Sequence, residues 1–179
     1  MYKRQVRLHT GDPSIYGAIR EQMNRLDELG IEYDICPGVS SMCGAAAALK
    51  AEYTVPDVSQ SIIITRMAGR TPVPAGEDIE ALAAHGATMV IFLSAGMTKE
   101  LSGSLIKGGY SSDTPAAIIY KATWPDELVL RCTVGTLYET AAKHGITKTS
   151  LITVGDFLGE GGMPSRLYDA SFETEFRKL

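Results

Sequence analysis

Short stretches with the residue pattern of β-strands alternate along this chain with stretches that repeat apolar residues at helical spacing. Strand patterns occupy residues 6–10, 31–36, 61–67, 87–96, 115–127, 128–135 and 150–158. Helical patterns occupy residues 14–29, 42–51, 76–86, 98–109 and 136–145. Because strands that alternate with helices form sheets covered by helices, the order predicts an α/β protein.

The length and the hydrophobic content set the expected number of domains. The chain has 179 residues, of which 45% are hydrophobic, enough for one domain or two small ones with buried cores. A stretch without periodicity, residues 53–60, divides the pattern into two lobes, which we place at residues 1–55 and 56–179. The first lobe has only two strand patterns and two helical patterns, too few to bury a core alone.

Charge and cysteine usage exclude several function classes. The net charge is −4 and no long basic run is present, so no nucleic-acid partner is expected. The three cysteines form no C-x-x-C pair, which favours a reducing, cytoplasmic location. The three histidines are scattered, so no metal site is predicted, and no stretch is long and apolar enough to span a membrane.

Polar turns follow many of the strand patterns, and ligands of open α/β sheets bind beyond the carboxyl ends of strands. The turns lie at residues 10–12, 37–41, 65–69, 93–96, 121–125 and 154–156. Each combines small residues with a few polar groups. This composition suits a bulky ligand that is held mainly by backbone atoms.

The turn "HTGDPSIYG" at residues 9–17 has two interpretations. Gly11 allows a close approach of backbone to a ligand, and the carboxylate of Asp12 would repel a phosphate but attract a cation or sugar hydroxyls. Alternatively, Asp12 merely caps the following helix. Two further segments have a structural interpretation beside a functional one. "PGVSS" can be a plain turn with a serine cap, and "KATWPDE" a hairpin rim.

Taken together and in order, these segments resemble the tetrapyrrole methylase family. The resemblance runs from about residue 6 to the end of the chain. It is carried by "HTGDPSIYGAI", "PGVSS", "SIIITR", "MVIFLSAG", "IIYKATWPDE", "VGDFL" and "SRLYDASFETEFR".

The resemblance implies the two-lobed α/β fold of class III methyltransferases, with S-adenosylmethionine bound between the lobes, and a homodimer. It implies methyl transfer to a ring carbon of a corrin precursor, a tetrapyrrole small-molecule substrate. By similarity, the residues expected to contact the methyl donor are Thr10, Gly11, Asp12, Ile15, Ser40, Ser41, Leu93, Ala122 and Val154.

The substrate carries many carboxylates around a flat ring, and we expect five residues to meet it. Arg66, Arg70 and Lys121 are candidates to bind the carboxylates, and Tyr16 and Trp124 to flank the ring. Arg66 also has a plain interpretation as a solvated strand end. Because the donor is already activated, no general acid or base is assigned.

The sequence departs from the family at one point. It contains no Gly-x-Gly-Pro-Gly-Asp loop, so we expect that the N-terminal lobe is truncated and that residues 1–5 are a stub. Three alternatives stay open: a family member with another substrate, an inactive fragment that only binds ligand, and a dinucleotide-dependent oxidoreductase. The absence of Gly-x-Gly-x-x-Gly counts against the third.

Overall fold

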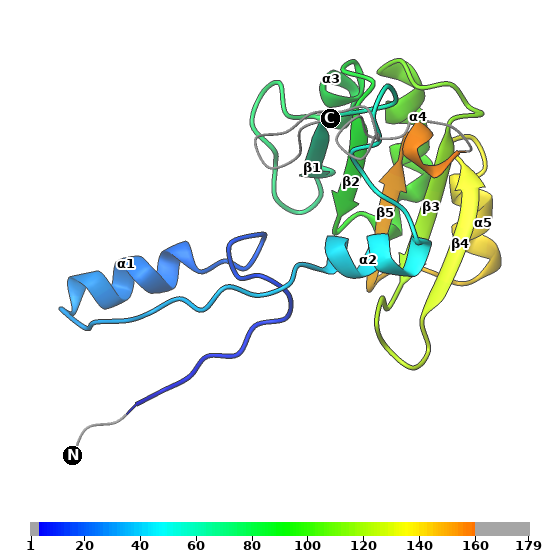
Figure 1. Ribbon diagram of the computed structural model, residues 1–179. Helices are drawn as coiled ribbons and strands as arrows, with labels where there is room; N and C mark the ends of the chain where they lie inside the picture. The colour runs from blue at the N-terminus through cyan, green and yellow to red at the C-terminus, as the bar shows by residue number, and fades with distance from the viewer. Residues whose placement is uncertain (1–3, 160–179) are drawn as a thin grey trace, which may run out of the picture.

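A computed structural model describes residues 4–159 of the chain, and its main body is a five-stranded sheet (Figure 1). The strands are β1 (Ile62–Arg66), β2 (Thr88–Phe92), β3 (Pro115–Tyr120), β4 (Leu128–Thr133) and β5 (Ser150–Val154). Their order across the sheet is β1-β2-β5-β3-β4. The α/β class predicted from the sequence is confirmed.

The direction of each strand decides which loops meet. β1 and β2 are parallel, whereas β5 is antiparallel to both β2 and β3, and β4 is antiparallel to β3. β1, β2 and β3 therefore end at one edge of the sheet, here called the carboxyl edge. β5 runs the other way and ends at the opposite edge.

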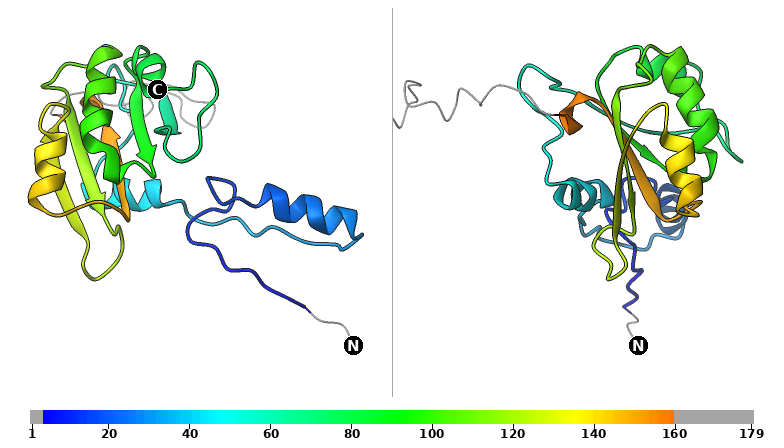
Figure 2. Two further views of the ribbon diagram at one scale, coloured as in Figure 1. Left: turned by 180° about the vertical axis from the view of Figure 1, so that it is seen from behind. Right: turned by 90° about the vertical axis from the view of Figure 1, so that its right-hand side faces the viewer.

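Helices cover both faces of the sheet (Figure 2). They are α1 (Arg20–Glu28), α2 (Ser41–Leu49), α3 (Ile79–Ala83), α4 (Thr98–Lys107) and α5 (Leu137–Lys143), with short 3-10 helices η1 (Ala95–Met97) and η2 (Asp156–Leu158). α3, α4 and α5 pack on one face and α2 on the other, whereas α1 lies apart from the sheet. No helix in residues 4–159 is long and apolar enough to cross a membrane.

Two apolar cores follow from the two-residue repeat of the strands. Met89, Ile118 and Ile152 point toward α3, α4 and α5, and all are fully buried. Their neighbours Val90 and Ile119 point the other way, into the core under α2. The strands are apolar on both faces because helices cover both faces. The helix α2 therefore packs on the same sheet as the rest of the body, although the lobe boundary at residue 55 placed it in the first lobe.

The N-terminal arm, residues 4–39, projects away from the sheet (Figure 1). Strands predicted at residues 6–10 and 31–36 are wrong for the described structure, since neither stretch pairs with another strand there. Their apolar side chains are exposed, Val6 to 80% and Leu8 to 89%. A strand needs a neighbour to bond its backbone groups, and alternating apolar residues alone do not supply one.

The predicted helix at residues 14–29 begins later, at Arg20. Tyr16 and Ala18 have φ angles of 56° and 51°, in the left-handed region, which a right-handed helix cannot include. Gly17 is packed so closely on Pro13 that a Cβ would lie 2.1 Å from its carbonyl oxygen. The other predicted helices and strands are confirmed with shorter bounds, while the tail after residue 159 lies outside the described residues.

Candidate functional site

Asp12 joins the two loops that the sequence singled out in the first lobe. Its Oδ2 accepts a hydrogen bond from the backbone N–H of Gly38 at 2.9 Å, and its Oδ1 accepts from the N–H of Ser14 at 2.8 Å and from the Ser14 hydroxyl. The Ser14 hydroxyl, followed by the Gly38 amide, lowers the pKa of Asp12. The interpretation of Asp12 as a helix cap is wrong, because α1 begins eight residues further on, at Arg20.

Tyr16 connects this pair of loops with the carboxyl edge. Its ring centroid lies 5.3 Å from that of Phe92, the last residue of β2, and the two rings are tilted by 49°. Desolvation by burial raises the pKa of Tyr16, and the positive charge of Arg66, at the end of β1, acts in the opposite direction. The Gly-Asp-Pro turn therefore sits near the ends of two strands 50 or more residues away.

The start of α2 faces the end of β3. Ser40 caps α2, its hydroxyl accepting from the N–H of Met42 at 3.5 Å; the sequence predicted a serine cap here and left Ser40 and Ser41 both open. A Cβ on Gly44 would lie 3.2 Å from the methyl group of Thr123 and 3.6 Å from the Cβ of Ala122. Glycine at this position lets α2 pack closely on the turn that follows β3.

Backbone strain gathers at the carboxyl edge. Leu93 directly follows β2 and has a φ angle of 54°, and Thr123, three residues after the end of β3, has a φ angle of 72°. The left-handed conformation costs a non-glycine residue about 1–2 kcal/mol, and such strain concentrates at functional sites. Leu93 is also 69% exposed, so an apolar side chain is held in solvent by an unfavourable backbone. An exposed apolar group fixed at the end of a strand suits contact with a ligand.

Lys121 and Trp124 lie on the hairpin that joins β3 to β4. The ammonium of Lys121 pairs with Asp126 and lies 5.1 Å and 5.3 Å from the ring centroids of Tyr120 and Trp124. The hydrogen bond to Asp126 raises the pKa of Lys121 and lowers that of Asp126. The cation is thus engaged within the hairpin, while the Trp124 ring stays 55% exposed.

Arg66 is engaged in the same way. Its guanidinium donates to the carbonyl oxygens of Met67 at 3.1 Å, Thr71 at 3.2 Å and Pro72 at 2.8 Å. These bonds shape the loop that follows β1. Arg70 lies in that loop and is exposed, with no hydrogen bond or ion pair among the described residues.

The structure brings most of the predicted site residues to one region and leaves one apart. The turn that carries Thr10, Gly11, Asp12 and Ile15 meets Ser40 and Ser41 through Gly11, and the turns after β2 and β3 carry Leu93 and Ala122. Val154 is fully buried and ends β5, where it pairs with Met89 and Ala116 near the starts of β2 and β3. It lies at the opposite edge because β5 is antiparallel.

Ser94 was missed by the sequence reasoning. Its buried hydroxyl accepts from the N–H of Met67 at 3.0 Å and donates to the carbonyl of Phe92 at 2.7 Å. It thereby ties the turn after β2 to the loop after β1. A serine directly after a buried apolar strand, within one of the predicted ligand turns, is the signal that could have identified it.

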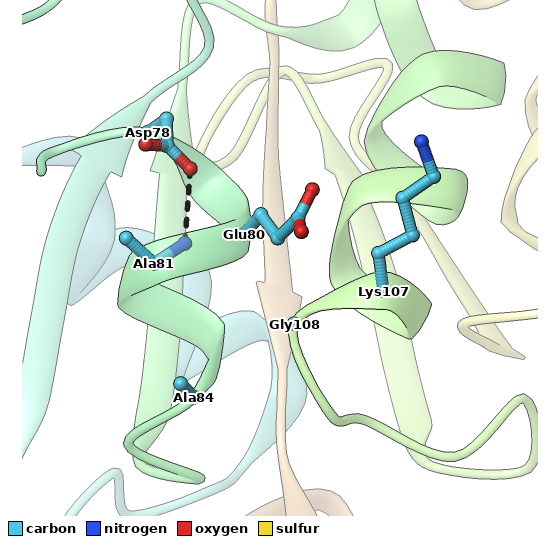
Figure 3. A pocket seen from close by; sticks show the side chains of 6 residues that line it. All are labelled: Asp78, Glu80, Ala81, Ala84, Lys107 and Gly108. Atoms are coloured by element: carbon cyan, nitrogen blue, oxygen red, sulfur yellow. Dashed lines mark hydrogen bonds between the residues drawn. The ribbon is translucent and has the colours of Figure 1, made fainter.

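A shallow groove between α3 and α4 contains none of the predicted site residues (Figure 3). It is lined by Asp78, Glu80, Ala81, Ala84, Lys107 and Gly108. Asp78 accepts a hydrogen bond from the N–H of Ala81 at 2.9 Å and so caps α3. Within residues 4–159 no group of three or more potential metal ligands occurs. The carboxyl edge remains the candidate site.

Comparison with known proteins finds relatives in sequence and in structure. The family model "Tetrapyrrole (Corrin/Porphyrin) Methylases" matches residues 2–138. A cobalt-precorrin-4 C(11)-methyltransferase from Methanocaldococcus jannaschii is 51% identical over 177 residues, covering 98% of this chain and 68% of the relative.

Two solved structures resemble the fold. One is a cobalt precorrin-4 methyltransferase described as a cobalamin biosynthetic enzyme, with a TM-score of 0.82 and 48% identity; the match covers 84% of this chain and 63% of that one. The other is a uroporphyrin-III C-methyltransferase from Thermus thermophilus in complex with S-adenosylhomocysteine, with a TM-score of 0.69 and 18% identity over 83% and 64% of the two chains. The chain thus spans slightly less than two thirds of these two structures.

Proposed function

This chain belongs to the tetrapyrrole (corrin/porphyrin) methylase family, and on that premise we propose that it methylates carbon 11 of precorrin-4 or cobalt-precorrin-4 in cobalamin biosynthesis, with S-adenosylmethionine as the methyl donor. The name of the Methanocaldococcus jannaschii relative gives the substrate and the carbon. The meeting of the Gly-Asp-Pro turn, the start of α2 and the ends of β1, β2 and β3 supports the assignment most directly.

The residues of this edge fit the donor. Gly11, with φ of 71°, and Ala122 expose backbone without bulky side chains, and Leu93 offers an apolar surface to a flat purine. Thr10 and Ser41 are exposed beside them and can bond to hydroxyl groups of the ribose. We place the donor against these residues and omit Val154, which is buried at the far edge.

Bound donor supplies a methyl group already activated by the sulfonium, so the chain's residues have to align the reactants and exclude water. Alignment of two reactants can lower the activation free energy by about 7–11 kcal/mol. The loops at the carboxyl edge suit this role, because their polar groups already bond to one another. No residue is required as a general base before transfer.

The structure changes which residues we propose for the substrate. Trp124, which is exposed and in contact with the Lys121 ammonium, is placed against the tetrapyrrole ring of the substrate, together with Tyr16. Arg70 is the exposed guanidinium beside the edge and is placed on a substrate carboxylate. Arg66 and Lys121 act mainly by holding the loops that carry Arg70 and Trp124.

The experiment measures methyl transfer from isotope-labelled S-adenosylmethionine to cobalt-precorrin-4 and to precorrin-4 by mass spectrometry. It is run on this chain and on a chimera that joins to it the remaining part of the Methanocaldococcus jannaschii relative. Transfer by either form to carbon 11 supports the proposal, and the comparison decides whether this chain suffices. Failure of both forms on both substrates would contradict the proposal. The homodimer stays a prediction, which analytical ultracentrifugation of the same samples checks.

A further inference from the structure

We propose that Asp12 is a positioning residue, which fastens the Gly-Asp-Pro turn to the loop before α2 and thereby holds the backbone that faces the donor. This inference rests on the proposed function. It differs from the expectation that Asp12 itself contacts the donor. The carboxylate acts through the loops it joins.

Both oxygens of the Asp12 carboxylate are occupied within the chain. Oδ1 accepts from the N–H and the hydroxyl of Ser14, and Oδ2 accepts from the N–H of Gly38 at 2.9 Å. The two residues joined by the last bond are 26 positions apart. Because the bond is charge-assisted, it is stronger than one between neutral groups. A carboxylate engaged in this way has little capacity left for a ligand.

The two loops also touch through their backbones. A Cβ on Gly38 would lie 2.2 Å from the carbonyl oxygen of Gly11, which no side chain could occupy without moving the loops apart. A Cβ on Gly11 would lie 3.6 Å from Ser40 and from the N–H of Ser41. The Asp12–Gly38 bond therefore stabilises the backbone contact that places Gly11 against the start of α2.

This arrangement predicts which substitutions act together. Asp12→Asn removes the negative charge and puts an amide NH₂ in place of one oxygen, so the charge-assisted bond to Gly38 is lost. Gly38→Ala keeps the carboxylate but forces the loops apart. If Asp12 acts through the loop contact, each change removes the same feature, and the double variant is no worse than either single one.

Nuclear magnetic resonance tests the Asp12–Gly38 hydrogen bond without any ligand. The Gly38 amide proton of the wild-type chain is expected to shift as Asp12 is protonated in acid, with a midpoint below the ordinary value for aspartate. In Asp12→Asn that transition is expected to disappear, and in Asp113→Asn, which removes a carboxylate beyond the far edge, to remain. If the Gly38 amide resonance does not shift as Asp12 titrates, the proposal is overturned.

Calorimetry with S-adenosylhomocysteine tests the consequence for the donor. Asp12→Asn and Gly38→Ala are each expected to weaken binding roughly tenfold, as for loss of one charge-assisted hydrogen bond, and the double variant to the same extent. Ser14→Ala, which spares the bond to Gly38, is expected to weaken it less. Multiplicative losses in the double variant would show that Asp12 acts independently of the loop contact, overturning the proposal. If neither the wild-type chain nor the chimera binds S-adenosylhomocysteine, the proposed function fails, and the Gly38 resonance still decides whether Asp12 fastens the loops.

Discussion

The ring of Tyr16 lies against that of Phe92, with 5.3 Å between their centroids, and this contact seats the Gly-Asp-Pro turn on the end of β2. Such aromatic pairs contribute about 0.5–1.5 kcal/mol beyond the area they bury. The remainder of the N-terminal arm projects from the sheet (Figure 1), so the turn meets the sheet through this contact and meets the start of α2 through Gly11.

Tyr16→Ala is expected to release the turn. Limited proteolysis should then cut between residues 10 and 20 several times faster than in the wild type, with little change in the melting of the sheet. Tyr138→Ala is the matched control, because Tyr138 is 48% exposed on α5 and Tyr16 is 44% exposed. Equal cleavage rates in the two variants would show that the contact with Phe92 does not hold the turn.

A buried hydroxyl lies in the core under α2. Within the described residues, Thr153 Oγ1 is buried and makes no hydrogen bond. Thr153→Val removes this group at nearly constant volume and is expected to stabilise the fold by about 1–2 kcal/mol. Thr88→Val is expected to destabilise it, because the buried Thr88 hydroxyl donates to the carbonyl of Tyr53 at 2.9 Å. Urea unfolding of both variants checks the opposite signs.

Two glycines inside helices differ only in their surroundings. Around Gly103 on α4 a Cβ would find open space, whereas on Gly44 it would press on Thr123. Gly103→Ala should therefore stabilise the protein by about 0.5–1 kcal/mol through helix propensity. Gly44→Ala should gain less or lose stability, and Thr123→Ser, which removes the methyl group in the way, should restore the gain. An equal rise in melting temperature for both single variants would contradict the close packing of α2 on the hairpin.

The three cysteines should react at different rates. Cys36 and Cys43 are exposed, whereas Cys132 is partly buried, and burial raises the pKa of its thiol to about 11. Because the thiolate is the reactive form, Cys132 should stay protonated and unreactive at pH 8. A thiol reagent should label two cysteines quickly and the third only on unfolding. Fast labelling of Cys132, identified by mass spectrometry, would contradict this.

Sequence reasoning found the sheet because its signals are local. The runs "III" and "MVIFL" are apolar throughout, and Ser40 stands at the start of the helix that it caps. It placed strands wrongly in the arm, since pairing depends on a neighbour that no local pattern reveals. It also began α1 too early, because the left-handed conformation of Tyr16 is set by packing.

The arrangement of the predicted site residues depends on the fold for a related reason. The sequence placed the turns together beyond the strand ends, which holds for the ends of β1, β2 and β3, whereas β5 ends at the opposite edge with Val154, a residue expected by similarity to contact the donor. The sequence analysis expected Arg66 and Lys121 to bind substrate carboxylates, yet both side chains bond within the chain. The sequence shows that a charged side chain is present, whereas only the fold shows which groups of the chain already bind it.

The central claim is that the donor binds at the carboxyl edge. The most direct test titrates S-adenosylhomocysteine into the isotope-labelled chain and maps the backbone amides whose resonances shift. We predict shifts at residues 10–12, 38–41, 93 and 122, and none in the groove between α3 and α4. Shifts confined to that groove or to the far edge around Val154, or no saturable shifts at all, would contradict the claim.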